Sequence, residues 1–255
     1  MPRALITGAT SGIGAEFAAQ LAAKGHALVL VARNTDRLAE KAAELSDRYG
    51  IETEVLAADL ADPTQVQTVA ERLLTNDDPI DILINNAGFG VHARLLDPDV
   101  MDNVTPAIDV MITAVTALAT AAARGMTERG SGRILNVSSV AGFVALGAYS
   151  AVKAYVTALT ESLAVELRGS GVTTTALCPG WVRTEFHTRA GINTTKLPGP
   201  VWIDVDQLVT EALSDLHRGV VVSVPRPQWK ATVIATRLLP RGVIRWVSAK
   251  IKSSR

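Results

Sequence analysis

The chain of 255 residues contains a single cysteine, Cys178. An intrachain disulfide is therefore excluded, and the composition suits a reducing compartment, so we expect the cytoplasm. Lys and Arg together number 25, and so do Asp and Glu, which leaves a formal net charge of zero. Without an excess of positive charge the chain has no global field to hold a nucleic acid, and we expect no such partner.

The sequence also lacks a long uninterrupted apolar run. The longest stretch, Val110 to Ala123, contains Thr113, Thr116 and Thr120, and its length suits a buried core helix rather than a bilayer crossing. The first residues enter a strand-like run almost at once, so we expect no signal peptide. No cluster of side chains has metal-ligand spacing, and we expect no metal dependence.

What the sequence does contain is a regular alternation of strand-like and helical segments. Its hydrophobic content of 48% is enough for one large core, so we expect a single domain. The expected strands begin near Ala4, Ala27, Thr53, Ile80, Arg133, Thr173 and Val220. Strand–helix units in succession predict an α/β fold with a Rossmann-like, doubly wound, seven-stranded parallel sheet. Such sheets bind ligands beyond the carboxyl ends of their strands.

The first strand leads into a glycine-rich turn, Thr7 to Gly14, and then into a helix. Glycines let the backbone turn tightly and approach a pyrophosphate, whose charge would sit at the helix N-terminus. The spacing is Gly-x-x-x-Gly-x-Gly rather than the commoner Gly-x-Gly-x-x-Gly. The turn therefore indicates a dinucleotide site, with a glycine-rich turn that binds no ligand as the alternative.

Arg33 directly follows the second strand, Ala27 to Ala32. In dinucleotide folds an acidic residue near this point accepts the ribose hydroxyls, whereas a basic residue accommodates a 2′-phosphate. Arg33 therefore favours NADP(H) as the cofactor. The alternative is an arginine at a strand end that points into solvent.

Tyr149 and Lys153 are four residues apart in an expected helix, so their side chains share one face. Free tyrosine has a pKa near ~10 and needs help to act as an acid or base near neutral pH, which a neighbouring ammonium group can supply. Ser138 and Ser139 end the fifth strand about ten residues upstream. Alone, the pair is better explained as an aromatic side chain and a lysine on an amphipathic helix than as a catalytic pair.

Taken together, these residues resemble the short-chain dehydrogenase/reductase family over about Ala4 to Val224. The resemblance rests on motifs in the family's order and at about its spacing: Thr7–Gly14, Asp59-Leu60, Asn85–Gly88, Ser139, Tyr149-x-x-x-Lys153, and Pro179-Gly180 with Thr184. It implies a Rossmann-fold domain over residues 1–225. It also implies an NADP(H)-dependent oxidoreductase that transfers hydride between nicotinamide and a ketone or secondary alcohol.

The resemblance assigns a role to each matching position. Tyr149 would donate a proton to the substrate carbonyl, Lys153 would hold the nicotinamide ribose and lower the pKa of the tyrosine, and Ser139 would hydrogen-bond the carbonyl oxygen. Ser139 is preferred to Ser138 because it directly precedes a Val-Ala-Gly tripeptide, as in the family. Besides Tyr149 and Lys153, the cofactor would contact Gly8, Ser11, Gly12, Ile13, Gly14, Arg33, Asp59, Leu60, Asn86, Ala87, Gly88, Pro179, Gly180, Val182 and Thr184.

Met111 departs from the family, whose asparagine in the long helix would fall at this position. Methionine cannot make the side-chain hydrogen bonds of an amide, but it keeps the backbone carbonyl that holds the water of the family's proton relay. We therefore expect a working enzyme with weakened turnover. The alternative is a sensor or scaffold that binds cofactor with weak or no turnover.

The residues expected to face the substrate are mostly apolar: Phe89, Val91, Phe143, Val144, Leu146, Trp181 and Phe186, with His92 and His187 nearby. They favour a ketone or secondary alcohol on a hydrophobic body, such as a fatty-acyl, steroid-like or other lipid-derived skeleton. The irregular segment of about residues 185–204 is predicted to be a substrate loop. Two helices that are apolar on more than one face favour a homodimer or homotetramer.

Residues 226–255 form a basic, amphipathic C-terminal extension with eight Lys or Arg and no Asp or Glu. We expect a helical segment that packs on the substrate loop or on a second subunit. The alternative is an interfacial segment that lies on an anionic membrane, which would make the chain a membrane-surface interaction protein.

Overall fold

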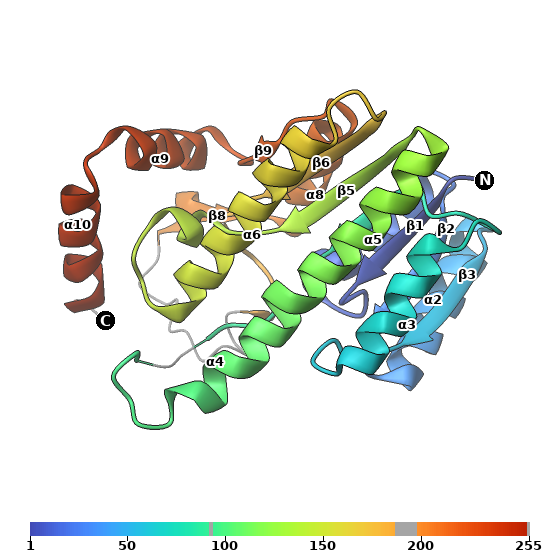
Figure 1. The fold of residues 1–255 in the computed structure, drawn as a ribbon, viewed down its shortest axis with the longest axis horizontal. Helices are drawn as coiled ribbons and strands as arrows, with labels where there is room; N and C mark the ends of the chain where they lie inside the picture. The colour runs from blue at the N-terminus through green and yellow to red at the C-terminus, as the bar shows by residue number, and fades with distance from the viewer. Residues whose placement is uncertain (92–93, 187–197, 254–255) are drawn as a thin grey trace.

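Seven parallel strands form one central sheet in the order β3-β2-β1-β4-β5-β6-β9 (Figure 1). This computed structural model of the chain describes residues 1–91, 94–186 and 198–253. The strands are β1 (Arg3–Thr7), β2 (Ala27–Ala32), β3 (Thr53–Ala57), β4 (Ile82–Asn85), β5 (Gly132–Val137), β6 (Val172–Leu177) and β9 (Val222–Ser223). The order reverses between β1 and β4, where doubly wound sheets bind their ligands. The predicted Rossmann-like sheet is confirmed.

Helices alternate with the strands, as the sequence predicts. They are α1 (Gly12–Ala23), α2 (Thr35–Tyr49), α3 (Pro63–Leu74), α4 (Val100–Ile108), α5 (Ala114–Arg129), α6 (Ala148–Glu166), α8 (Val205–His217), α9 (Pro227–Leu238) and α10 (Arg241–Ser253). Capping side chains set several starts. The Asn34 side chain accepts a hydrogen bond from the Arg37 amide at 2.9 Å before α2. Asp62 accepts one from the Thr64 amide at 2.8 Å, and proline occupies the first position of α3.

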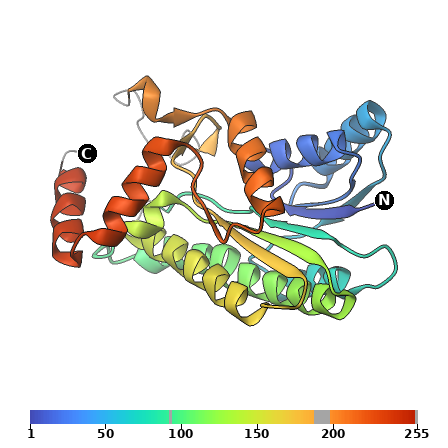
Figure 2. The ribbon, with the colours of Figure 1, turned by 90° about the horizontal axis from the view of Figure 1, so that it is seen from above.

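The strands are buried on both faces, which explains their continuous apolar sequences. Alternate residues of β2 belong to different cores: Leu28 and Leu30 pack with α1, α2 and α8, whereas Val29 and Val31 pack with α3, α5 and α6. All four side chains are fully buried. Figure 2 shows the sheet between these two helical layers.

The helical run from Val100 to Arg129 is long and apolar enough to cross a membrane by length and composition. Half of its most apolar window is buried within the fold, and α5 contributes Leu118 and Met126 to the core over β4 and β5. It is therefore a core helix, as predicted. Pro106 lies inside α4, and the irregularity of this helical run is a π-helical segment at Asp109–Thr113.

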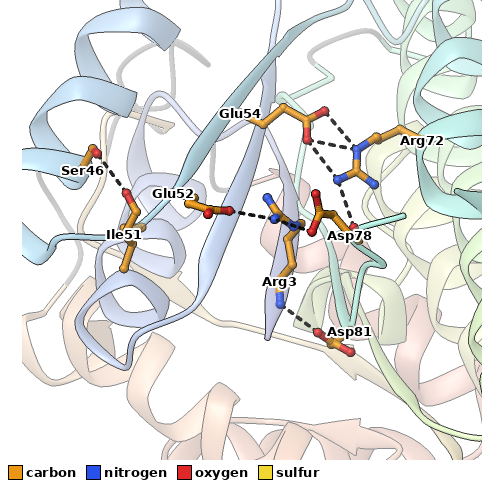
Figure 3. A network of polar contacts seen from close by, with 8 residues as sticks. All are labelled: Arg3, Ser46, Ile51, Glu52, Glu54, Arg72, Asp78 and Asp81. Atoms are coloured by element: carbon orange, nitrogen blue, oxygen red, sulfur yellow. Dashed lines mark hydrogen bonds and ion pairs between the residues drawn. The ribbon is translucent and has the colours of Figure 1, made fainter. Parts of the chain in front are cut away.

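Arg3, at the amino end of β1, contacts three carboxylates that lie far from it in the sequence (Figure 3). Its guanidinium lies 3.0 Å from Glu52 and 3.4 Å from Asp78, which precede β3 and β4. Its backbone amide donates to the Asp81 carboxylate at 2.8 Å. Because a buried guanidinium needs partners, these contacts fix the start of β1 relative to the segments before its neighbours.

The C-terminal residues form two helices rather than one segment, and both helices lie at one end of the molecule (Figures 1 and 2). The Ala145 amide donates to the Ser248 hydroxyl of α10 at 3.1 Å, just before α6. The Gln228 side chain of α9 donates to the Pro200 carbonyl at 3.1 Å, in the described part of the predicted substrate loop. Residues 187–197 of that loop lie outside the described residues.

Candidate active site

A cavity of about 1020 Å³ lies at the carboxyl ends of the strands. It extends from the glycine-rich turn before α1 to the start of α6 and to α9. Every residue predicted to contact the cofactor lines this cavity except Gly14: Gly8, Ser11, Gly12, Ile13, Arg33, Asp59, Leu60, Asn86, Ala87, Gly88, Tyr149, Lys153, Pro179, Gly180, Val182 and Thr184.

Gly14 does not line the cavity, but it allows the start of α1 to pack closely against the backbone of Gly8. A Cβ at this position would lie 2.3 Å from the Gly8 carbonyl oxygen, so no larger residue fits. The Asn86 side chain donates to the Thr7 carbonyl at 2.9 Å and braces the same turn from β4. Ser11 and Gly12 bring the positive N-terminal end of α1 to the cavity, an arrangement that suits a pyrophosphate.

Two arginines line the cavity beyond the end of β2. Arg33 is the predicted contact for a 2′-phosphate, and Arg37, on the first turn of α2, joins it. The Arg37 guanidinium donates to the Thr10 carbonyl at 3.2 Å. Sequence reasoning missed Arg37, although its position four residues after Arg33 places both at the same end of β2.

Tyr149 and Lys153 lie on the cavity side of α6, one turn apart. The Lys153 ammonium is 5.7 Å from the centroid of the tyrosine ring and donates to the Val137 carbonyl at 2.9 Å. The Ser139 hydroxyl accepts a hydrogen bond from the Ala141 amide at 3.1 Å and also hydrogen-bonds Tyr149. Strand β5 and helix α6 thus bring three polar side chains to one point.

Ser138, by contrast, is only 2% exposed and serves the interior. Its hydroxyl donates to the Lys153 carbonyl at 2.7 Å and lies 2.7 Å from the Thr157 hydroxyl, which ties β5 to α6. The Ser139 hydroxyl lies beside Tyr149 instead. This division favours Ser139 over Ser138 as the residue that contacts a substrate.

Burial governs the protonation of the pair. It raises the pKa of Tyr149 to about 12, although the hydrogen bond with Ser139 opposes the rise. It also lowers the pKa of Lys153 to about 8. The lysine charge was expected to lower the tyrosine pKa, but burial raises it in this structure, and the opposing contribution comes from Ser139 rather than from Lys153. A tyrosine with so high a pKa keeps its proton at neutral pH, as a proton donor requires.

The family model for short chain dehydrogenases matches residues 2–194. The chain belongs to the short-chain dehydrogenase family. It is 37% identical, over 74% of its length and 70% of the relative's, to a Streptomyces violaceoruber protein assigned as ketoacyl reductase 1 of the granaticin polyketide synthase. Membership makes the chain an oxidoreductase that acts on alcohols or ketones.

Solved structures of short-chain dehydrogenases share the whole fold. One from Sphingobium yanoikuyae, in complex with NADPH, is 39% identical and has a TM-score of 0.83, over 93% of this chain and 94% of the other. The bulky-bulky ketone specific alcohol dehydrogenase from Comamonas testosteroni is 34% identical and has a TM-score of 0.80, over 93% and 92% of the two chains. These matches extend the similarity beyond residue 194.

Met111 of this short-chain dehydrogenase lies within the π-helical segment and is 1% exposed. Its sulfur packs against Gly88, where an added Cβ would lie 2.9 Å from the Sδ atom. Ala107 and Val152 complete this small apolar cluster, and Tyr149 packs against it. The Met111 side chain therefore belongs to the apolar cluster against which Tyr149 packs. Irregular helical turns of this kind are frequent at functional sites.

The predicted substrate residues line the same cavity: Phe89, Val91, Phe143, Val144, Leu146, Trp181 and Phe186. The rings of Tyr149 and Phe186 lie with their centroids 6.2 Å apart. His92 and His187, expected nearby, lie outside the described residues. In the part of the chain that the structure describes, no group of three His, Cys, Asp or Glu side chains is placed to hold a metal ion.

Helix α9 supplies a cavity wall that sequence reasoning missed. Trp229, Thr232, Val233 and Thr236 recur at the spacing of one helix face and all line the cavity. This periodicity within the basic extension was the available signal. Helix α9 of the C-terminal extension is therefore part of the site.

Proposed function

We propose that this short-chain dehydrogenase is an NADP(H)-dependent reductase of ketones carried on bulky hydrophobic bodies. The observation that carries the proposal is the cavity itself. At one point it presents the Ser139 and Tyr149 hydroxyls, and around them it presents an apolar wall. A wall of this kind with few polar groups holds an apolar molecule and fixes the orientation of its one reactive carbonyl.

Several features support NADP(H) rather than NAD(H). Arg33 and Arg37 line the cavity beyond the end of β2, where two guanidinium groups would suit a 2′-phosphate, and β2 ends without a carboxylate. The close turn at Gly8 and Gly14, beside the N-terminus of α1, suits the pyrophosphate that NAD(H) and NADP(H) share, so it supports a dinucleotide but does not choose between the two. The related Sphingobium enzyme is in complex with NADPH.

In this proposal the bound cofactor supplies the hydride for the carbonyl carbon. Tyr149 holds the proton for the carbonyl oxygen, since its raised pKa keeps the phenol protonated at neutral pH. Ser139 donates a hydrogen bond to the same oxygen as negative charge develops there. Lys153, 5.7 Å from the tyrosine ring, would offset the charge that the departing proton leaves on the phenolate.

The substrate class follows from the wall and from the relatives. Phe143, Val144 and Phe186 surround the hydroxyls with apolar surface, and the cavity is large enough for an extended or polycyclic body beside the cofactor. The relatives include an assigned ketoacyl reductase and an alcohol dehydrogenase specific for bulky-bulky ketones. A fatty-acyl, steroid-like or other lipid-derived ketone fits both lines of support.

The test is NADPH oxidation with a series of ketones that carry the same carbonyl and increasingly large apolar groups. We expect kcat/KM to rise along the series. Tyr149→Phe should lower turnover by about 10²- to 10⁴-fold, because the proton donor is lost, and should weaken NADPH binding far less than that, because the other cofactor contacts remain. A flat series with retained turnover would reject the hydrophobic substrate, and full activity of Tyr149→Phe would reject the assigned donor.

A sensor or scaffold is the second candidate, and the apolar packing of Met111 is the observation that favours it. Without an amide at this position the helix lacks the side-chain hydrogen bonds that asparagine would make. NADPH binding without oxidation of the cofactor by any ketone in the series would support this reading. Loss of NADPH binding would reject both candidates.

We also propose that the enzyme works as a cytoplasmic homodimer or homotetramer. Tyr155 and Val165 expose 39% and 60% of their surface on α6, where a second subunit would cover them. Cys178 is a free, buried thiol, which suits a reducing compartment. Light scattering of the purified chain measures the mass directly, and a monomer at micromolar concentration would reject the assembly.

A further inference from the structure

Helix α9 has two unlike faces. Trp229 and Val233 lie on the face that lines the cavity. Ile234 and Leu238, on the opposite face, expose 57% and 80% of their surface. Large apolar side chains exposed one turn apart mark an interaction surface rather than a solvated helix.

Helix α10 continues this exposed apolar surface. Its Ile244 and Ser248 point inward and are 4% and 2% exposed. Val243, Trp246 and Val247 are 39%, 60% and 37% exposed on the remaining surface of the helix. Leu239, between the two helices, is 43% exposed. We call this set the C-terminal apolar surface: Ile234, Leu238, Leu239, Val243, Trp246 and Val247.

Positive charge surrounds the C-terminal apolar surface. Lys230, Arg241 and Arg245 are exposed, and the Lys250 ammonium lies 4.6 Å from the centroid of the Trp246 ring. Residues 226–255 include no Asp or Glu at all. Residues 1–225 therefore carry the compensating net negative charge, and α9 and α10 form a positively charged end of a molecule whose total charge is zero (Figures 1 and 2).

We propose that α9 and α10 dock the enzyme onto an anionic phospholipid surface. An exposed tryptophan among aliphatic side chains enters the headgroup boundary of a bilayer, and lysines and arginines beside it pair with lipid phosphates. The negative surface potential of an anionic leaflet attracts polybasic segments, and each cation near the surface strengthens the binding. The C-terminal apolar surface would enter the headgroup boundary of the bilayer, and the lysines and arginines around it would contact the lipid phosphates.

A bilayer fits this surface better than a second copy of the chain. In a twofold contact the same patch meets itself, which would bring Arg241, Arg245 and their copies together without any carboxylate from either extension. Like charges that meet in an interface oppose association. An anionic membrane presents the opposite charge along the whole rim.

Docking would also set the orientation of the active site. The cavity lies against one face of α9 and the membrane would contact the opposite face. A single helix would then separate the substrate cavity from the lipid. This arrangement suits the lipid-like substrates of the proposed function, but the docking itself does not depend on them.

The experiment is flotation of the full-length chain with vesicles, without substrate or cofactor. We expect it to float with phosphatidylcholine vesicles that contain about one third phosphatidylglycerol, to bind far less to pure phosphatidylcholine, and to dissociate at high salt. Trp246→Glu and Val247→Glu should each lower the partition coefficient by about tenfold or more. Arg241→Gln with Arg245→Gln should remove most of the preference for anionic lipid.

Val55→Glu is a matched control, because Val55 on β3 is also 37% exposed but lies outside the C-terminal apolar surface. It should float like the unchanged protein. Turnover of a short, water-soluble ketone should be the same in Val247→Glu and Val55→Glu, which verifies folding. Failure of the full-length chain to float, or equal losses in the two valine variants, would reject docking. A fall in molecular mass in Val247→Glu alone would assign the surface to a second subunit instead.

Discussion

Gly180 lies directly against the indole of Trp229. A Cβ at position 180 would lie 2.0 Å from Cε2 of that ring. The indole nitrogen also donates to the Val201 carbonyl at 3.2 Å. Gly180 belongs to the family motif after β6, whereas Trp229 belongs to α9, beyond the residues that the family model matches. The tryptophan therefore couples the cofactor side of the cavity to the C-terminal extension.

We predict that Gly180→Ala destabilises the fold by about 1–3 kcal/mol, because the new methyl group must displace the indole. In the Trp229→Ala background the same change should cost much less, since the ring is gone. Urea unfolding of the unchanged protein, the two single variants and the double variant gives the coupling energy between positions 180 and 229. We expect a coupling energy of about 1 kcal/mol or more. Simple additivity of the two changes would show that the glycine is not held by the tryptophan.

Met111 gives a second prediction. Met111→Asn places a polar amide in the apolar cluster of Ala107 and Val152 and should lower the free energy of unfolding by about 1–3 kcal/mol. Turnover should stay within about tenfold of the unchanged enzyme, because the backbone carbonyl at this position is kept. Met111→Leu conserves volume and should cost less than about 1.5 kcal/mol. If the unchanged enzyme reduces no ketone and Met111→Asn does, the expectation of a working enzyme is wrong.

Cofactor preference gives a third prediction. Arg33→Ala and Arg37→Ala should each lower kcat/KM for NADPH by about 10- to 100-fold, because a hydrogen bond to a charged phosphate contributes about 1.5–3 kcal/mol. The values for NADH should change little. Arg48→Ala, on the same helix but outside the cavity lining, is the control and should leave both values unchanged. Equal losses with the two cofactors would remove the 2′-phosphate assignment.

The sequence alone predicts most of the fold and the centre of the site. Strand β2 begins and ends at the expected residues, Ala27 and Ala32, because its continuous apolar run is a local signal. The spacing of four residues between Tyr149 and Lys153 places both on one face of α6. Sequence patterns therefore predict the structure correctly where it depends on contacts between residues within one helical turn or one strand.

Features that depend on distant parts of the chain were not predicted. Trp181–Val182 pairs with Trp202–Ile203 in a small two-stranded sheet. Neither dipeptide carries a sequence signal that predicts this pairing. The wall formed by α9 was not predicted, because the periodicity of its apolar residues indicates a packed helix face but does not identify the cavity that this face lines. The tyrosine pKa was expected to be lowered by a neighbouring charge, but burial, which no local pattern reveals, raises it.

Lys153 gives a fourth prediction, on stability against pH. Burial lowers its pKa from 10.5 to about 8, so between these values the unfolded chain binds a proton that the folded chain does not. Stability rises with pH wherever the unfolded state binds more protons. The contribution of Lys153 to the free energy of unfolding should therefore grow from about pH 8 upward and level off near the ordinary lysine pKa.

Lys153→Met isolates this contribution, because methionine does not titrate. We expect the unfolding free energy of the unchanged protein, minus that of the variant, to rise by about 1–2 kcal/mol between about pH 8 and about pH 9.5. The difference should be flat below about pH 7, where the amine is charged in both states. A flat difference for Lys153→Met would mean that the buried amine keeps its ordinary pKa.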